Sequence, residues 1–230
     1  MKLKISVALL AFVTAVIPLS LSAESDLARA VASRDAARTY ANLPLRFEPA
    51  AEQGHFLARS GGYAVLVGAG ESAIAITDAT SGSTRTLRFS FDRSNAAAQI
   101  EAIEPLPGIT NYYIGQDPGK WRLGVRNFAK LRTKDVYPGV DVIYYGDNRR
   151  LEFDFVVAPM ADPRAIALTL SGMDKLYINA DGELVAEVNG RAVRFAKPYA
   201  YQKVSGSAKA VSVEYALAGP GRAQLQNRRL

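Results

Sequence analysis

The sequence predicts an all-β fold, an antiparallel β-sandwich-like domain of about a dozen short strands. Apolar and polar residues alternate with a period of two through most of the chain after residue 43. Turn sequences rich in glycine, asparagine and aspartate recur about every 8 to 12 residues. Only one segment has helical spacing. These observations leave open whether two sheets pack face to face or one sheet closes on itself.

The first strands are expected around glycine turns. Residues 63–67 and 72–77 alternate on either side of Gly68-Ala69-Gly70, and in residues 84–91 every second side chain is large and apolar. Gly68 also begins a G-x-G-x-x-A pattern, which occurs in dinucleotide-binding loops. Because alternating residues rather than a helical pattern follow it, we interpret it as a hairpin turn.

The clearest hairpin is expected at residues 140–157. Two alternating segments flank the turn Gly146-Asp147-Asn148, and the apolar residues of 151–157 share one face. Later strands are expected at residues 166–170, 211–217 and 223–226. The turns between them contain Asn-x-x-Gly and Asn-Gly sequences, in which glycine supplies the positive φ that tight hairpins require.

The first 23 residues have the three parts of a secretory signal peptide. Lys2 and Lys4 precede an apolar run over residues 5–16, and small residues follow up to Ala23. The run is shorter than the roughly 20 residues that span a bilayer. We therefore expect residues 1–23 to be a cleaved signal peptide of a secreted or cell-envelope protein. A retained membrane anchor is the alternative.

Residues 24–42 are expected to form a linker or a short helix, because residues 25–41 have loose helical spacing behind a capping Ser25. The period changes to two at Leu43-Pro44-Leu45, so a single β-rich domain is expected over residues 43–230. Cleavage after Ala23 would remove two lysines and lower the formal net charge from +6 to +4.

Composition excludes several functions. The chain has no cysteine and one histidine, so thiol catalysis, disulfides and cysteine-based metal sites are excluded, and zinc is not expected. We interpret His55 as an ordinary loop or surface residue. The positive charge is scattered, so nucleic-acid binding is not expected. No metal or cofactor is predicted, with calcium on turns such as Asp147-Asn148 as an alternative.

Glu152 and Asp154 form a candidate catalytic pair. They lie two apart on one predicted strand, about 6 to 7 Å apart at the backbone, and glycoside hydrolases use paired carboxylates about 5 to 9.5 Å apart. Trp121, Tyr144 and Tyr145 offer rings for stacking on a sugar. We favour the alternative that the carboxylates belong to a solvated strand face, so no catalytic residue is assigned. The five residues are a candidate ligand-binding face.

Six ordered motifs extend over much of the chain. They are Leu43-Pro-Leu-Arg-Phe-Glu48, Phe56-Leu-Ala-Arg-Ser-Gly-Gly-Tyr63, Asn111-Tyr-Tyr-Ile-Gly-Gln-Asp-Pro-Gly-Lys-Trp121, Val136-Tyr-Pro-Gly-Val-Asp-Val-Ile-Tyr-Tyr145, Leu151-Glu-Phe-Asp-Phe-Val-Val-Ala-Pro159 and Lys197-Pro-Tyr-Ala-Tyr-Gln202. Together they resemble the N-terminal domain of bacterial secreted proteins with SBBP-type β-propeller repeats. The segment after Glu48 is shorter than in that family. The sequence ends at Leu230, where the relatives continue into repeats, so a stand-alone module and a truncated longer protein are both open.

The resemblance implies an exported β-rich module that precedes propeller repeats or adhesin-like domains, without established catalytic residues. We therefore expect a non-catalytic module of the bacterial envelope or extracellular space. It would bind a polysaccharide or an envelope protein, or scaffold its neighbours. A carbohydrate-active hydrolase that uses Glu152 and Asp154 is the alternative.

Overall fold

The computed structural model describes residues 2–11, 45–51, 53–60, 63–77, 84–113, 115–147, 150–204 and 207–226. Within these ranges the chain forms eighteen strands and two short 3-10 helices. The predicted all-β, antiparallel class is confirmed, with more strands than the expected dozen. The linker or helix expected at residues 24–42 lies outside the described residues. None of the described helices is long and apolar enough to cross a membrane.

The strands belong to one sheet. One edge of the long strand β8 (Arg122–Tyr137) pairs with β2 at Phe128 and with β9 from Lys130 onward, and the sheet divides there into two wings. The first wing contains, in pairing order, β2 (Phe47–Pro49), β3 (Phe56–Ser60), β4 (Tyr63–Val67), β5 (Glu71–Thr77), β6 (Thr84–Phe91), β11 (Ala167–Ser171), β18 (Arg222–Gln226) and β17 (Glu214–Leu217).

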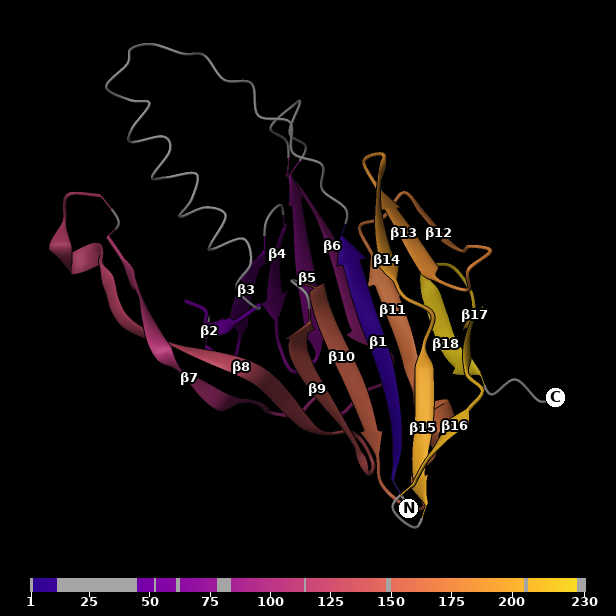
Figure 1. Cartoon of the computed structure of the whole chain (residues 1–230). Helices are drawn as coiled ribbons and strands as arrows, with labels where there is room; N and C mark the ends of the chain where they lie inside the picture. The colour runs from indigo at the N-terminus through magenta and orange to yellow at the C-terminus, as the bar shows by residue number, and fades with distance from the viewer. Residues whose placement is uncertain are drawn as a thin grey trace, which may run out of the picture.

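The second wing begins with β9 (Val140–Asp147), β10 (Arg150–Val157) and β1 (Leu3–Ala11). Beyond β1 it continues in two branches, β15 (Tyr199–Val204) with β16 (Ser207–Val211), and β14 (Arg191–Phe195) with β13 (Leu184–Val188) and β12 (Lys175–Ile178). At the far ends of the wings β12 contacts β17, so the sheet nearly closes on itself (Figure 1).

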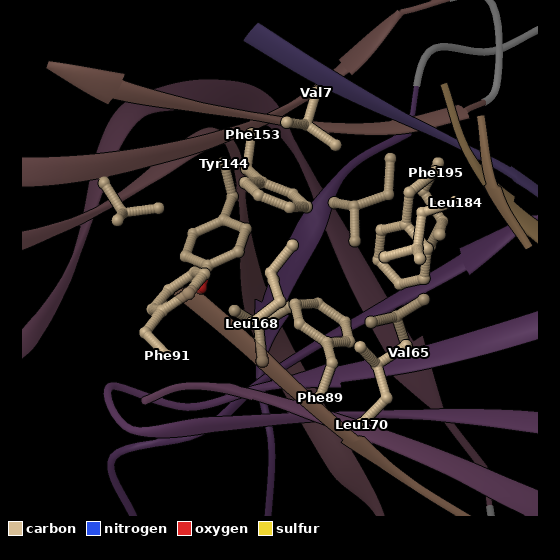
Figure 2. Packing of buried hydrophobic residues seen from close by; sticks show 14 of the residues in the cluster. Val7, Val65, Phe89, Phe91, Tyr144, Phe153, Leu168, Leu170, Leu184 and Phe195 are labelled. Atoms are coloured by element: carbon tan, nitrogen blue, oxygen red, sulfur yellow. The ribbon is translucent and has the colours of Figure 1, made fainter. Parts of the chain in front are cut away.

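The hydrophobic core fills the space between the two wings of this nearly closed, barrel-like sheet, so one sheet curves around the core instead of two separate sheets packing face to face. Phe89 of β6 stacks on Phe153 of β10 at 5.8 Å and meets Phe195 of β14 edge-on at 5.6 Å. The ring centres of Phe91 and Phe155 lie 5.1 Å apart. Phe89, Phe91, Phe153 and Phe195 are labelled in Figure 2. Each of these residues alternates along its strand with a polar or more exposed neighbour, so one face of each strand supplies the core.

The predicted turns are confirmed. Gly68-Ala69-Gly70 joins β4 to β5 in a hairpin. β9 ends at Asp147 and β10 begins at Arg150, which pair with each other, whereas Asn148 of the predicted turn lies outside the described residues. Gly182 and Gly190 have the positive φ angles (80° and 71°) expected in the β12–β13 and β13–β14 turns. The strand expected at residues 211–217 is interrupted. Val211 pairs with β15 in the second wing and Glu214 with β18 in the first, so the chain crosses between wings there.

A long arm, formed by β7 (Ile100–Tyr112), the first part of β8 and the described residues between them, extends away from the wings (Figure 1). It was not among the predicted strands. β7 contains Pro105 and Pro107, which lack the N–H that a central strand needs. It is an edge strand that pairs with β8 alone among the described strands. The register slips between Pro105 and Ile109, and this bulge bends the arm.

Residues 3–11, which the sequence places in a signal peptide, form strand β1 inside the second wing. Seven residues of β1 pair with β10, and the opposite edge pairs with β15 and β14. Ile5, Val7 and Leu9 are at most 2% exposed. Apolarity and alternation suit a buried strand as well as the apolar region of a leader. Cleavage after Ala23 stays a prediction.

Candidate functional site

Glu152 and Asp154 face the same way, as expected, on the side of β10 that is turned away from the core. Two neighbouring strands contribute to this face, because Glu152 pairs with Tyr145 of β9 and with Ala8 of β1. The Tyr145 hydroxyl donates a hydrogen bond to Asp154 Oδ1 at 3.2 Å. Lys4 Nζ lies 2.6 Å from Asp154 Oδ2 and 5.8 Å from the centre of the Tyr145 ring. We call Lys4, Tyr145, Glu152 and Asp154 the Asp154 cluster.

Asp154 is the buried member of the cluster, whereas Lys4, Tyr145 and Glu152 are partly exposed. The Asp154 side chain is 2% exposed, whereas that of Lys4 is 36% exposed. Burial, followed by the negative charges of Asp154 and Glu152, raises the pKa of Tyr145, so its hydroxyl keeps its proton and acts as a donor. Burial alone would lower the pKa of Lys4, but its hydrogen bond and attraction to Asp154 raise it on balance. Asp154 is therefore a buried carboxylate with a charged partner.

Burial also raises the pKa of Glu152, with repulsion from Asp147 adding to the effect. A half-buried carboxyl with a raised pKa is a recognised general acid. The second carboxylate is less suited to chemistry, because a sugar would have to displace Lys4 before it reached Asp154. The described residues contain no group of three or more histidine or acidic side chains placed to hold a metal.

The raised pKa of Glu152 predicts a pH dependence. The folded state holds this proton more tightly than the unfolded chain, so stability falls as pH rises from below the ordinary value of 4.5 through the raised value. Glu152→Gln is expected to remove that fall, because an amide does not titrate. Urea unfolding at several pH values between 4 and 8 checks this, with Glu104→Gln on the exposed arm as the control. Equal pH slopes in the wild-type and Glu152→Gln proteins would contradict it.

A pocket of about 600 Å³ adjoins the Asp154 cluster, with Tyr145 in its wall. It lies between the arm and β9. Its lining is contributed by β7, β8, β9 and the residues before β2, and includes Leu45, Leu106, Ile109, Thr110, Asn111, Asn127, Lys130, Tyr145 and Gly146. A side chain at Gly146 would collide with Leu45, so glycine permits the close approach of β9 to this segment. Volumes of about 300 to 1,000 Å³ are usual for ligand pockets.

The polar groups of this pocket are held by hydrogen bonds across the arm. Asn127 is 3% exposed, and its amide nitrogen donates to Gly108 O at 3.1 Å and to Thr110 Oγ1 at 3.0 Å. Asn111 Oδ1 accepts from the backbone N–H of Gly124 at 2.8 Å. The bulge in β7 thus places Ile109, which is 61% exposed, at the mouth of the pocket. Sequence reasoning missed this site, although Pro105-Leu106-Pro107-Gly108 signals an irregular edge strand.

Of the five residues predicted to form a ligand-binding face, the structure brings together Tyr145, Glu152 and Asp154. Tyr144 points into the core, where its ring centre lies 5.8 Å from that of Phe153 (Figure 2). Its side chain is 1% exposed, because neighbours on a strand face opposite sides. Trp121 lies at the end of the arm against Tyr113, with ring centres 5.0 Å apart. Tyr144 and Trp121 therefore do not belong to the Asp154 cluster.

A second polar cluster, also missed from sequence, attaches the arm to the first wing. The Tyr112 hydroxyl donates to both oxygens of Glu48 at 2.6 and 2.7 Å, and Arg59 also contacts Glu48. Glu48 is 4% exposed. Arg122 donates to the backbone oxygen of Pro49 at 2.7 Å. Because these bonds join β7 and β8 to β2 and β3, they support the arm that lines the pocket.

His55 precedes β3 and is partly buried, and its Nδ1 lies 3.3 Å from the backbone oxygen of Gln53. This contact is local to the turn. His55 is not a member of the Asp154 cluster and does not line the 600 Å³ pocket. It lines a separate pocket of about 400 Å³ with residues of β3, β4, β5 and β6, and its interpretation as an ordinary loop residue stays a prediction.

Comparison with known proteins gives one result. The sequence matches the family described as "Domain of unknown function (DUF7948)" over residues 44–226. No curated protein and no solved structure gives a significant match. The matched range contains the arm, the pocket, and three of the four residues of the Asp154 cluster, whereas Lys4 and β1 precede it. Since the match covers most of the sequence, the chain belongs to the DUF7948 family of domains of unknown function.

Proposed function

We propose that the protein is a non-catalytic binding module of the bacterial envelope or extracellular space, and that its ligand occupies the pocket between the arm and β9. The observation that carries the proposal is this 600 Å³ pocket, with its apolar mouth and buried asparagine. The ligand is a surface polysaccharide or an extended segment of an envelope protein. Both present apolar faces and hydrogen-bonding groups in alternation.

The exposed surface of the arm supports this proposal. Four of the large apolar side chains that the structure leaves exposed lie on the arm, namely Leu106, Ile109, Tyr113 and Leu123. Apolar side chains grouped on one projecting element mark interaction surfaces. Lys130 and Tyr145 in the pocket wall add polar groups for orienting a ligand.

Ile109→Asp is expected to weaken ligand binding at least about 10-fold, because it puts a charge at the apolar mouth of the pocket. Its effect on stability should stay within about 0.5 kcal/mol, since the side chain is exposed. The measurement incubates the purified protein with insoluble polysaccharides and cell-wall material, and records bound protein and released reducing ends. Binding without release is the expected result.

The matched control is Met160→Asp, which puts the same charge on a fully exposed apolar residue outside the pocket. It should bind like the wild type. Equal binding by Ile109→Asp would contradict the pocket as the binding site. Release of reducing ends would overturn the non-catalytic proposal in favour of the hydrolase, and Glu152→Gln and Asp154→Asn should then abolish that release.

Export and the link to longer proteins are parts of the same proposal. The leader-like residues 1–23 support export, and the six motifs support an association with SBBP-type repeat proteins. Fractionation of a bacterium that expresses the full chain tests export. N-terminal sequencing of the exported form then tests cleavage after Ala23.

A further inference from the structure

We propose that the groove between β10 on one side and β14 and β15 on the other is an acceptor site for a β-strand, and that a strand of an envelope protein replaces β1 there once residues 1–23 are removed. We call this groove the strand slot. Strand exchange in the cell rests on the proposed export and cleavage. The capacity of the strand slot to accept a strand does not depend on either of them.

The strand slot has two edges that need a partner. Leu3 to Leu9 pair with β10, Leu3 to Ser6 also pair with β15, and Leu9 to Ala11 also pair with β14. Without β1, the backbone N–H and C=O groups on both edges would lose these partners. Unpaired strand edges are templates for pairing with another chain, and β-strand addition is an established mode of peptide recognition.

The slot also has a defined chemistry. Ile5, Val7 and Leu9 of β1 are at most 2% exposed, so the floor of the slot is the hydrophobic core. On the opposite face Lys4 lies 2.6 Å from the buried Asp154. Removal of β1 would uncover core side chains and take this cation from Asp154. The incoming strand should therefore have apolar residues at the three core positions and a basic residue in place of Lys4.

The residues matched by the family include the strands that border the strand slot but not β1, which fills it. β10, β14 and β15 lie within residues 44–226, whereas β1 lies outside them. The walls of the slot thus belong to the domain that defines the family, and the strand that fills it comes from a segment with the features of a leader. A domain whose sheet is completed from outside is suited to receive that strand from another protein.

Strand exchange tests the proposal on the full chain. The chain is made in a membrane-free translation system, with a specific protease site inserted between Ala23 and Glu24. The cut protein is unfolded in urea and refolded with excess fluorescent peptide of residues 2–11, so that slow release of β1 cannot hide exchange. Uptake by cut protein should exceed uptake by uncut protein at least about 10-fold, because a tethered β1 competes at high effective concentration.

Variant peptides define the specificity. Val7→Lys should reduce uptake at least about 100-fold by burying a charge in the core, and Lys4→Glu about 10-fold by placing like charges together. The matched control, Ala8→Lys, points away from the core towards Glu152 and should bind like the parent peptide. An unrelated peptide with the same apolar pattern and a lysine at the same position should also enter.

Three results would overturn the proposal. They are equal uptake of a scrambled peptide, uptake of the parent sequence but not of the unrelated patterned peptide, and refolding of the cut protein to its original thermal stability with no peptide bound. The last would mean that the slot has closed. The Ile109→Asp variant should take up the peptide normally, so failure of the pocket proposal and failure of the slot proposal can be told apart.

Discussion

Replacement of Phe153 by alanine is expected to lower the free energy of unfolding by about 3 to 5 kcal/mol. Phe153 is fully buried in the core (Figure 2). Its ring centre lies 5.8, 6.0 and 5.8 Å from those of Phe89, Phe91 and Tyr144. Alanine would leave a cavity between the two wings that rigid strands on both sides cannot close. Urea-induced unfolding followed by circular dichroism measures the change.

The control for this prediction is Tyr113→Ala on the arm. Tyr113 is 66% exposed, so its loss should cost less than about 1 kcal/mol. A similar cost for both variants would contradict the position of Phe153 between the wings. A loss of unfolding free energy for Phe153→Ala below the expected range, with the same slope of free energy against urea concentration as the wild type, would mean that the wings do not share one core.

Val7→Lys in the full chain is expected to lower the free energy of unfolding by more than about 3 kcal/mol, or to prevent folding. Val7 is fully buried, and its side chain points to the core beside Phe153 (Figure 2). The new ammonium group would lie among the apolar side chains of the described core, away from solvent. The same unfolding measurement applies, on protein from the membrane-free system so that residues 1–23 stay attached.

Ala8→Lys adds the same charge to the adjacent residue of β1. Ala8 pairs with Glu152 on the face away from the core, so the added lysine gains a carboxylate neighbour. Its stability should lie within about 0.5 kcal/mol of the wild type. Equal stability of the Val7→Lys and Ala8→Lys proteins would show that β1 is not part of the folded sheet.

Much of the fold was predictable because strand and turn signals are local. The alternation of Leu151, Phe153 and Phe155 identifies a buried strand face without any knowledge of its partners. Glycine at positions such as 182 and 190 marks turns for the same reason, since the positive φ is a property of one residue. The arm was missed because β7 is interrupted by two prolines and a bulge, so its pattern lacks a clean period.

The candidate site was less predictable, since burial depends on neighbours from elsewhere in the chain. Alternation places Glu152 and Asp154 on the polar face of β10, but only the adjacent β1 brings Lys4 to Asp154 and covers it. The same alternation separates Tyr144 from Tyr145, one in the core and the other in the Asp154 cluster. The pocket required residues of β7, β8 and β9 and the segment before β2 to meet in space, which no local pattern encodes.

The sequence by itself determined the all-β class, the positions of strands such as β4, β5, β6, β9 and β10 with several turns, and the core-facing side of those strands, because these follow from side-chain alternation and backbone preferences. Only the tertiary structure decided how the strands join into two facing wings, that residues 3–11 complete the second wing, and that Asp154 is buried. The physical reason is that pairing partners and burial are set by strands distant in sequence. The same apolar pattern is compatible with a segment that enters a membrane and with a strand buried in a sheet.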